Sequence, residues 1–365
     1  MVGVPTVALV GTGLIGGSVG MALRRSGVAV RGFDADADRS EAAVAAGALD
    51  SASSSIGDVV DGVDVVVVAV PVGAVSAAVI ETLDACGAVV TDVGSVKGPI
   101  LAAVTAARPD DVGRFVGGHP MTGSEQVGLD GADADLLVGA TWVLTPTERT
   151  DAAAFATVQS LVARLGAEVI ATTPERHDEL VAVVSHVPQL AATTLMDLAA
   201  AVGEEHATLL RLAAGGFRDM TRIAASDATI WPDICVENRD AIVIALDRYL
   251  EALDRVRSLV AAGERDELLA VLERARDARR SLPTGVPTGE ALAELRIPVP
   301  DRLGVLADVT TLAGELGINI TDVEIAHSVE GGGGVLVLVV AASTAGKLEA
   351  ALAARGYHSG HTELP

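Results

Sequence analysis

Residues 7–16 read Val-Ala-Leu-Val-Gly-Thr-Gly-Leu-Ile-Gly, an apolar run followed by glycines in the spacing GxGxxG. The run predicts a buried strand, and the glycines after it predict a turn into a helix. Gly11 permits the tight turn, Gly13 lets a pyrophosphate approach the backbone, and Gly16 lets the helix pack on the strand. A glycine-rich turn in an α/β domain that binds nothing is the alternative. We expect a dinucleotide-binding loop made of Gly11, Thr12, Gly13, Leu14, Ile15 and Gly16.

An acidic residue completes this loop. The second expected strand, VAVRGFD, ends in Asp34, whose carboxylate can accept a hydrogen bond from the adenosine ribose. The same carboxylate would repel the additional phosphate of NADP, so NAD is the expected cofactor. Arg31 and Arg39 lie nearby and leave NADP use open. By analogy with similar folds, Val70 and Pro71 should lie over the adenosine after the third strand.

The rest of the chain divides by its apolar spacing. Short Val-rich runs alternate with Ala-rich helical stretches up to about residue 169, which predicts a largely parallel sheet with helices on both faces. After Pro174 the spacing becomes helical, and one long helix is expected from about residue 232 to 260. The predicted parts are an α/β Rossmann-type NAD-binding domain (1–172), an all-α dimerisation domain (173–280), a linker (281–292) and a ferredoxin-like βαββαβ domain (293–365).

Composition excludes several classes of partner. The 365 residues include 26 Lys+Arg and 49 Asp+Glu, a net charge of −23 that repels nucleic acids and anionic membranes. No apolar run approaches the roughly 20 residues of a membrane span. Cys86 and Cys235 cannot form a disulfide framework, and no Cys/His cluster suggests a metal. We therefore expect a cytoplasmic protein that acts on a small molecule and binds no nucleic acid, membrane or metal.

Two polar segments follow expected strands. DVGSVK (92–97) and GGHPMTG (117–123) therefore lie at the carboxyl edge of the sheet, where α/β proteins bind ligands. His119 is held on a short loop, and its neutral imidazole can accept a proton from a hydroxyl. The alternative is a loop histidine that caps a backbone group. Lys97 is expected either to approach the cofactor or to lie in solvent.

The chain resembles the prephenate dehydrogenase family over about its first 280 residues. This resemblance implies an NAD-dependent oxidative decarboxylation of prephenate to 4-hydroxyphenylpyruvate, a step of tyrosine biosynthesis. It also implies a dinucleotide-binding domain followed by a helical dimerisation domain. The motifs that carry it are GLIGGS (13–18), DVGSVK (92–97), GGHPMTG (117–123), SHVPQ (185–189) and GGFRDMTRIAASD (215–227).

The resemblance assigns roles at four matching positions. His119 would bind the ring hydroxyl and take its proton as the hydride departs. Ser95 would orient that hydroxyl or His119 itself. Arg222 would pair with the ring carboxylate, a task for which a planar guanidinium is suited. Glu125 would lie near the side-chain end of the substrate.

The helix expected after Pro174 supplies further substrate-binding candidates. At a spacing of four, His177, Ser185 and Gln189 share one face, and Pro188 should kink the helix near Ser185. Polar groups and a kink suggest the wall of a cleft; a solvated face with a capping histidine is the alternative. His186 lies about a hundred degrees around the helix and is either a substrate contact or an interior contact. Members of the family often have a histidine in place of Gln189, which leaves the side-chain specificity open.

Residues 295–327 resemble an ACT domain, a ligand-sensing module of amino-acid enzymes. Leu303 replaces the usual proline of that family. Gly304 opens a helix whose N-terminus can receive an amino-acid carboxylate, and Asn319 begins the facing strand. We expect feedback binding of tyrosine or another aromatic amino acid; a purely structural dimer module is the alternative.

The sequence is compatible with four candidate activities, which it favours to different degrees. Prephenate dehydrogenase is the leading one, and arogenate dehydrogenase shares its mechanism, since arogenate differs only in carrying an amino-acid side chain. A catalytically silent sensor of NAD and an amino acid is a third. A β-hydroxyacid dehydrogenase or imine reductase is disfavoured, because no lysine stands on the Pro174 helix where the hydroxyacid enzymes use one. A homodimer formed by the helical domain is expected.

Overall fold

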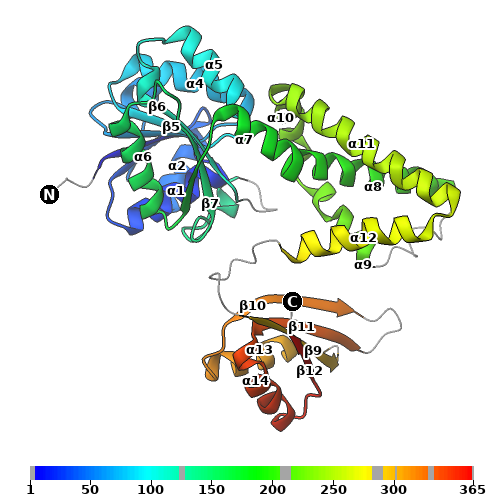
Figure 1. The fold of residues 1–365 in the computed structure, drawn as a ribbon. Helices are drawn as coiled ribbons and strands as arrows, with labels where there is room; N and C mark the ends of the chain where they lie inside the picture. Colours follow the sequence, from blue (N-terminus) through cyan, green and yellow to red (C-terminus); the bar gives the residue numbers. More distant parts are fainter. Residues whose placement is uncertain are drawn as a thin grey trace. The chain divides into compact units, whose positions relative to one another are not determined.

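The computed structural model describes residues 5–122, 128–205, 215–281, 291–300, 302–327 and 333–363. Among them the chain forms two compact units. The first contains residues 5–205 and 220–252, and the second contains residues 215–219 and 253–363. The predicted helical domain (173–280) is thus divided between the units. Figure 1 shows the α/β part of the first unit in blue to green and the C-terminal sheet in orange and red.

An eight-stranded sheet forms the centre of the first unit, in the order β3-β2-β1-β4-β5-β6-β7-β8. Its strands run parallel except between β6 and β7, which pair antiparallel. The order reverses between β1 and β4, a point at which open α/β sheets bind ligands. The strands are β1 Val7–Val10, β2 Val30–Phe33, β3 Ser51–Ala52, β4 Val65–Val68, β5 Val89–Asp92, β6 Phe115–Pro120, β7 Thr141–Thr145 and β8 Glu168–Ala171.

Both faces of this sheet are buried at its centre, because apolar residues fill every position of β1 and β4. In β1, Val7 and Leu9 join one core cluster, whereas Ala8 and Val10 join another. Helices α1 and α6 cover the first face, and α3, α4 and α5 cover the second. The helices are α1 Leu14–Arg25, α2 Ala37–Ala45, α3 Ile56–Val59, α4 Val72–Ala85, α5 Gly98–Ala107 and α6 Ala152–Arg164, with 3₁₀ turns η1 Val112–Arg114 and η2 Leu129–Gly131.

Helices continue the chain after the sheet. Pro174 opens the first of them, and the hydroxyl of Thr173 caps it by accepting from the Arg176 amide. The single helix expected from residue 232 to 260 is wrong, because the chain breaks at Asn238 into α10 and α11. The elements are α7 Pro174–Val181, the π turn η3 Ala182–His186, α8 Val187–Glu205, α9 Gly215–Thr221, η5 Arg222–Ala225, η6 Ala228–Ile230, α10 Trp231–Glu237, α11 Arg239–Ala262 and α12 Arg265–Arg280.

The second unit ends in a four-stranded antiparallel sheet in the order β10-β11-β9-β12. This order and the βαββαβ sequence are those of the predicted ferredoxin-like fold. Alternate residues of β9, namely Ala293, Leu295 and Ile297, pack with the two helices in one core. The elements are β9 Leu292–Pro300, α13 Val305–Glu315, β10 Ile320–His327, β11 Gly333–Ala341, α14 Ala342–Ala354 and β12 Gly360–Glu363. None of the helices in the described ranges is long and apolar enough to cross a membrane.

Candidate active site

The glycine loop has the geometry that its sequence predicts. Gly11 has φ +98°, and a Cβ there would collide with the carbonyl of Ala69 and approach Val70. A Cβ on Gly16 would collide with the carbonyl of Gly11, so the helix can pack this closely only without a side chain. Gly13 faces open space, with no atom within 4 Å of its ideal Cβ. The loop is therefore tight against the sheet and open on the ligand side.

This loop fits a dinucleotide. Helix α1 begins after Gly13 with no side-chain cap and no acidic residue in its first turn, so its free amides can bind a pyrophosphate. Val70 lies against Gly11, and the exposed Pro71 is the N-cap of α4. These positions are compatible with the adenosine contacts expected for both residues.

Asp34 also holds the loop itself. Its Oδ2 accepts hydrogen bonds from the amide of Thr12 at 2.8 Å and from the Thr12 hydroxyl at 2.9 Å. Its Oδ1 accepts from the amide of Asp36 at 3.0 Å. A carboxylate has about four acceptor sites, so capacity remains for a ribose hydroxyl. The sequence predicted the ribose contact but not this link to Thr12.

His119 belongs to β6 and lies at the carboxyl edge of the sheet, opposite Val143 of β7. Its imidazole is half-buried, and its Nδ1 lies 2.8 Å from Nε2 of His177. The two rings meet edge to face, with centroids 5.1 Å apart. The structure thus joins two predicted site residues that are 58 positions apart in the chain. His119 is therefore not the loop histidine capping a backbone group, and His177 does not lie on a solvated face; these were the alternatives from the sequence.

Asp178 continues the chain of contacts beyond His177. Nδ1 of His177 lies 2.7 Å from Oδ1 of Asp178. The carboxylate also accepts from the backbone amides of Lys97 at 2.9 Å and Gly98 at 2.8 Å, which open helix α5. The side-chain amide of Asn238 donates to the carbonyl of Asp178 at 3.0 Å. The break between α10 and α11 therefore places a polar side chain against α7.

Lys97 neither approaches solvent nor remains available for a cofactor. It is 2% exposed, its ammonium pairs with Asp92, and it donates to the carbonyl of Gly118 at 2.7 Å. Asp92 accepts from the amides of Gly94 and Gly118. Burial lowers the pKa of Lys97, whereas Asp92 and Asp178 raise it. This ion pair fastens the end of β5 to the residue that precedes His119.

The surroundings keep His119 neutral. Burial lowers its pKa well below the usual value, and His177, Lys97 and His186 lower it further. Burial also lowers the pKa of His186 to about 4, although Asp178 opposes this shift. A neutral imidazole has one nitrogen free to accept a proton.

The other predicted side chains of the helical region have different surroundings. His186 is buried, with Nδ1 3.2 Å from the Asn238 amide and its ring 6.1 Å from that of Trp231, so it makes interior contacts. Gln189 is buried, whereas Ser185 is half-buried. The π turn adds one residue to this part of the helix. His186 therefore lies on the buried face, at the place that Ser185 was expected to occupy.

The other predicted site residues lie in separate parts of the fold. Ser95 is half-buried and lies in the chain between Asp92 and Lys97. The hydrogen bond that the described structure gives to the His119 ring joins its Nδ1 to His177. Arg222 is exposed at the start of η5, which packs on α8. Glu125 lies outside the described residues. In the second unit, Gly304 has φ +90° and caps α13, and the exposed Asn319 precedes β10.

Asp178 and Asn238 belong to the site but were not predicted, and Asp92 was predicted only as part of the segment 92–97, without a role of its own. A signal existed for Asp178, since it follows His177 directly and histidine-carboxylate pairs are a recurrent way to orient an imidazole. No local pattern marks Asn238, whose role depends on the packing of α10 and α11 against α7.

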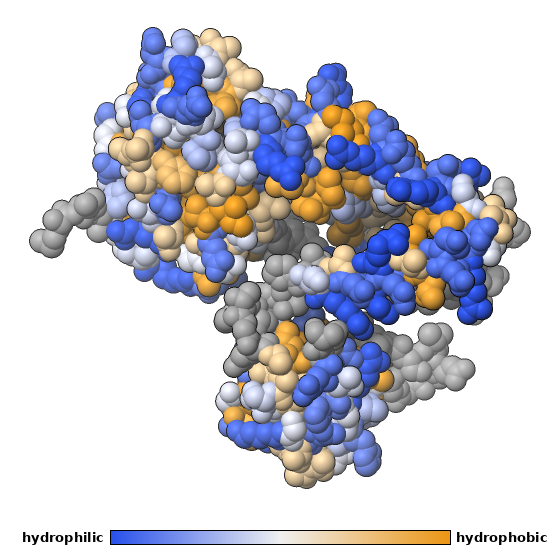
Figure 2. Space-filling view, viewed as in Figure 1, coloured by the Kyte–Doolittle hydropathy of each residue, from blue (hydrophilic) through white to orange (hydrophobic). Residues whose placement is uncertain are grey.

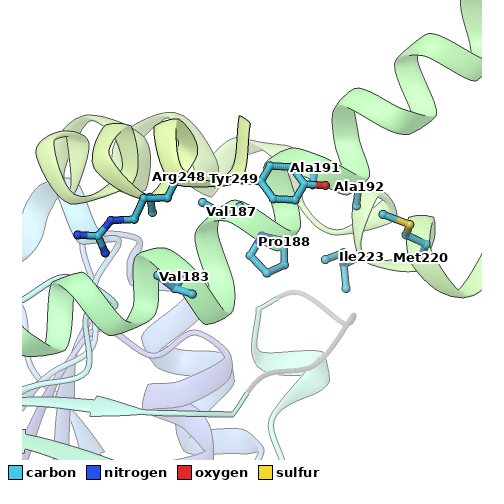
Figure 3. Close-up of a pocket in the computed structure, with 10 residues that line it drawn as sticks. Val183, Val187, Pro188, Ala191, Ala192, Met220, Ile223, Arg248 and Tyr249 are labelled. Carbon is cyan, nitrogen blue, oxygen red and sulfur yellow. The ribbon is translucent and has the colours of Figure 1, made fainter. Parts of the chain in front are cut away.

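A cavity of about 550 Å³ opens between α8, η5 and α11. Figure 3 shows Tyr249, Pro188 and Ile223 around it, with the guanidinium of Arg248 at one end and Met220 at the other. Most of its lining is apolar. It is therefore a hydrophobic feature of the helical region, distinct from the polar groups around His119.

Comparisons with known proteins agree on one family. The model of the prephenate dehydrogenase nucleotide-binding domain matches residues 19–171, and that of the prephenate dehydrogenase dimerization domain matches residues 173–274. The prephenate dehydrogenase of Bacillus subtilis (strain 168) is 32% identical over 341 residues, which are 91% of this chain and 91% of that protein.

Two solved structures extend the likeness to the fold. Prephenate dehydrogenase from Aquifex aeolicus, in complex with hydroxyphenyl propionate and NAD+, has a TM-score of 0.72 at 32% identity and covers 77% of this chain and 99% of its own. Synechocystis arogenate dehydrogenase has a TM-score of 0.66 at 30% identity and covers 75% of this chain and 98% of its own.

Proposed function

Because the chain belongs to the prephenate dehydrogenase family, we propose that it catalyses the NAD-dependent oxidative decarboxylation of prephenate to 4-hydroxyphenylpyruvate in tyrosine biosynthesis. It is an NAD-dependent oxidoreductase. The observation that carries this function is a neutral, hydrogen-bonded His119 at the sheet edge that also carries the open glycine loop. Together they supply a proton acceptor and a dinucleotide site on one edge.

NAD, when bound along Gly11–Gly16 and Asp34, supplies the acceptor for the hydride. His119 takes the proton of the ring hydroxyl as the hydride leaves the carbon that bears it. The resulting carbonyl is conjugated through the ring to the carbon that carries the carboxylate, so the electron pair of the breaking carbon–carboxylate bond flows to the carbonyl oxygen. Carbon dioxide departs, the ring becomes aromatic, and His119 returns its proton to the phenolate oxygen. The protein needs only to position these groups and assist one proton.

Other residues of the chain hold the substrate in this proposal. Arg222 pairs with the ring carboxylate, and Ser95 orients the hydroxyl. Gln189 and Ser185 bind the side-chain end. His177 and His186 contribute from the helical wall, His177 through His119 and His186 as an interior support.

Arogenate is the second candidate substrate. A structural relative of similar identity is an arogenate dehydrogenase, and the ring chemistry is the same for both compounds. The side chains differ in one group, a keto acid in prephenate and an amino acid in arogenate. Substrate turnover therefore discriminates the two, while the role of His119 is common to both.

The deciding experiment measures NADH formation by the purified protein with prephenate and, separately, arogenate, each with NAD and with NADP. We expect turnover of prephenate with NAD. His119→Asn should lower kcat by at least about 100-fold, the contribution of a general base, with the affinity for NAD unchanged. Preference for arogenate would reassign the substrate, and absence of turnover with both would contradict the enzymatic function.

We further propose a homodimer formed through the helical region. Large apolar side chains lie exposed on its helices, among them Val184, Leu198, Ile244 and Leu250. Figure 2 shows hydrophobic side chains gathered on the surface of this region. Contiguous exposed apolar surface is characteristic of a protein interface. The match to a dimerization domain supports a second copy of this chain as the partner.

We propose tyrosine as a feedback effector of the C-terminal sheet. Gly304 places the N-terminus of α13 at the surface, and the exposed Asn319 precedes β10. A helix N-terminus suits a carboxylate. Calorimetric titration with tyrosine should show binding accompanied by inhibition; no heat and no change in activity would leave the unit a structural module.

Both cysteines are free, which suits the proposed cytoplasmic location.

A further inference from the structure

We propose that His177 and Asp178 are positioning residues, which fix the tautomer of His119 so that its Nε2 presents a lone pair to the substrate hydroxyl. This inference rests on the proposed function for its catalytic meaning. Its structural basis is the continuous chain of contacts from the N-terminus of α5 to β6 described above. Neither residue touches the reacting atoms in this scheme; both act through His119.

The direction of the hydrogen bonds is set at Asp178. Its Oδ1 accepts from the amide of Lys97, and its Oδ2 accepts from the amide of Gly98. Backbone amides can only donate, so both carboxylate oxygens act as acceptors. The nitrogen that also lies 2.7 Å from Oδ1, Nδ1 of His177, therefore carries a hydrogen and donates it.

The remaining assignments follow along the chain. With its hydrogen on Nδ1, a neutral His177 has a lone pair on Nε2. Nδ1 of His119 lies 2.8 Å from that lone pair and so carries the hydrogen of their shared bond. The only unprotonated nitrogen left on His119 is Nε2, which is the nitrogen that a general base requires.

Neighbouring groups hold this arrangement rigid and define its electrostatics. The Asn238 amide donates to the Asp178 carbonyl, and the Lys97–Asp92 pair fixes Gly118 directly before His119. Lys97, His177 and His186 disfavour a positive charge on His119, so it is neutral before the reaction. Once His119 has accepted the proton, the negative carboxylate of Asp178 stabilises the cation through His177.

The test is the substitution Asp178→Asn. A carboxamide has one oxygen, so it cannot accept from all three donors that Asp178 accepts, the amides of Lys97 and Gly98 and Nδ1 of His177. Where its nitrogen faces His177, the two histidine bonds reverse and His119 carries its hydrogen on Nε2. We expect kcat to fall by about 100-fold or more, as when a triad carboxylate is replaced by an amide, with KM for substrate and for NAD within about twofold.

A direct readout does not depend on turnover. Imidazole ¹⁵N chemical shifts of the ligand-free protein at neutral pH should show His119 protonated on Nδ1 in the native protein, with the Nε2-protonated form appearing in Asp178→Asn. Glu179→Gln is the matched control, because it neutralises the next carboxylate on the same helix, which is exposed and pairs only with Arg176 among the described residues. It should change neither the tautomer nor kcat.

A second pair of variants covers the case in which Asp178→Asn does not fold. His177→Gln keeps an oxygen that can accept from Nδ1 of His119, whereas His177→Leu does not. The glutamine variant should retain at least about tenfold more kcat than the leucine variant. A native His119 protonated on Nε2, or equal kcat in the two His177 variants, would overturn the inference. Absence of turnover in the native protein would instead count against the proposed function.

Discussion

Single side chains set the chemistry of this site through their neighbours. His119 is neutral because desolvation of its half-buried ring lowers its pKa and the nearby His177, Lys97 and His186 lower it further; burial also lowers the pKa of His186. Both histidines could be selected from the sequence as polar residues in unusual places. The contacts of Asp178 and Lys97 could not be predicted in the same way, because they form only when α7 packs against the N-terminus of α5.

The histidines make the stability of the fold depend on pH. In the unfolded chain His186 titrates near 6.5, but in the folded protein its pKa is about 4. Between these values the unfolded chain binds more protons, so the stabilisation present above pH 6.5 is lost as the pH falls toward 4. At pH 5 the loss from this group amounts to about 2 kcal/mol of unfolding free energy.

Urea denaturation at pH 7 and pH 5 measures this loss. The native protein should be less stable at pH 5, and His186→Phe should show a smaller difference between the two pH values by about 2 kcal/mol. The phenylalanine ring can still pack against Trp231. An equal pH dependence in the two proteins would show that His186 is not the titrating group.

At the scale of elements, apolar runs predicted the long strands, whereas a short polar strand and a helix break had no such signal. Runs such as Val65–Val68 were sufficient to place the central strands. The short β3 was missed, because Ser51–Ala52 carries no apolar pattern. The apolar stripe of residues 232–260 continues across Asn238, so periodicity could not show where α10 ends and α11 begins.

The glycine loop allows fold and cofactor binding to be separated. Gly13→Ala places a methyl group in open space, so the unfolding free energy should change by less than about 0.5 kcal/mol while the Kd for NAD rises about tenfold. Gly16→Ala drives a methyl group into the Gly11 carbonyl and should cost about 1–3 kcal/mol as well as NAD affinity.

NAD titration by fluorescence and urea denaturation measure the two effects. Gly57→Ala, an exposed helical position with space for the methyl group, is the control and should leave NAD binding unchanged. If Gly13→Ala bound NAD as well as the native protein, the pyrophosphate would not lie over this residue.

For the whole molecule, the strongest expectation concerns assembly. The helical region exposes large apolar side chains that a monomer would leave in water, and its sequence matches a dimerization domain. Composition alone did not locate this surface, because apolar residues are abundant along the entire chain. It became visible only once the helices showed which side chains the monomer leaves uncovered.

Ile244→Lys should therefore shift the mass measured by light scattering from dimer toward monomer. Ile170→Lys is its control: both isoleucines are 54% exposed, but Ile170 lies on β8 of the α/β part. We expect the control to remain dimeric. Dissociation of both variants, or of neither, would contradict a dimer formed through α11.

The π turn at Ala182–His186 has a consequence for how this helix is compared between proteins. Such a turn accommodates one residue more than an α-helical turn of the same length. A relative without it would carry a one-residue deletion here, and its residues downstream would rotate by about 100° if the gap were ignored. Correct alignment of Gln189 with its counterparts thus depends on whether each relative has kept or lost this single inserted residue.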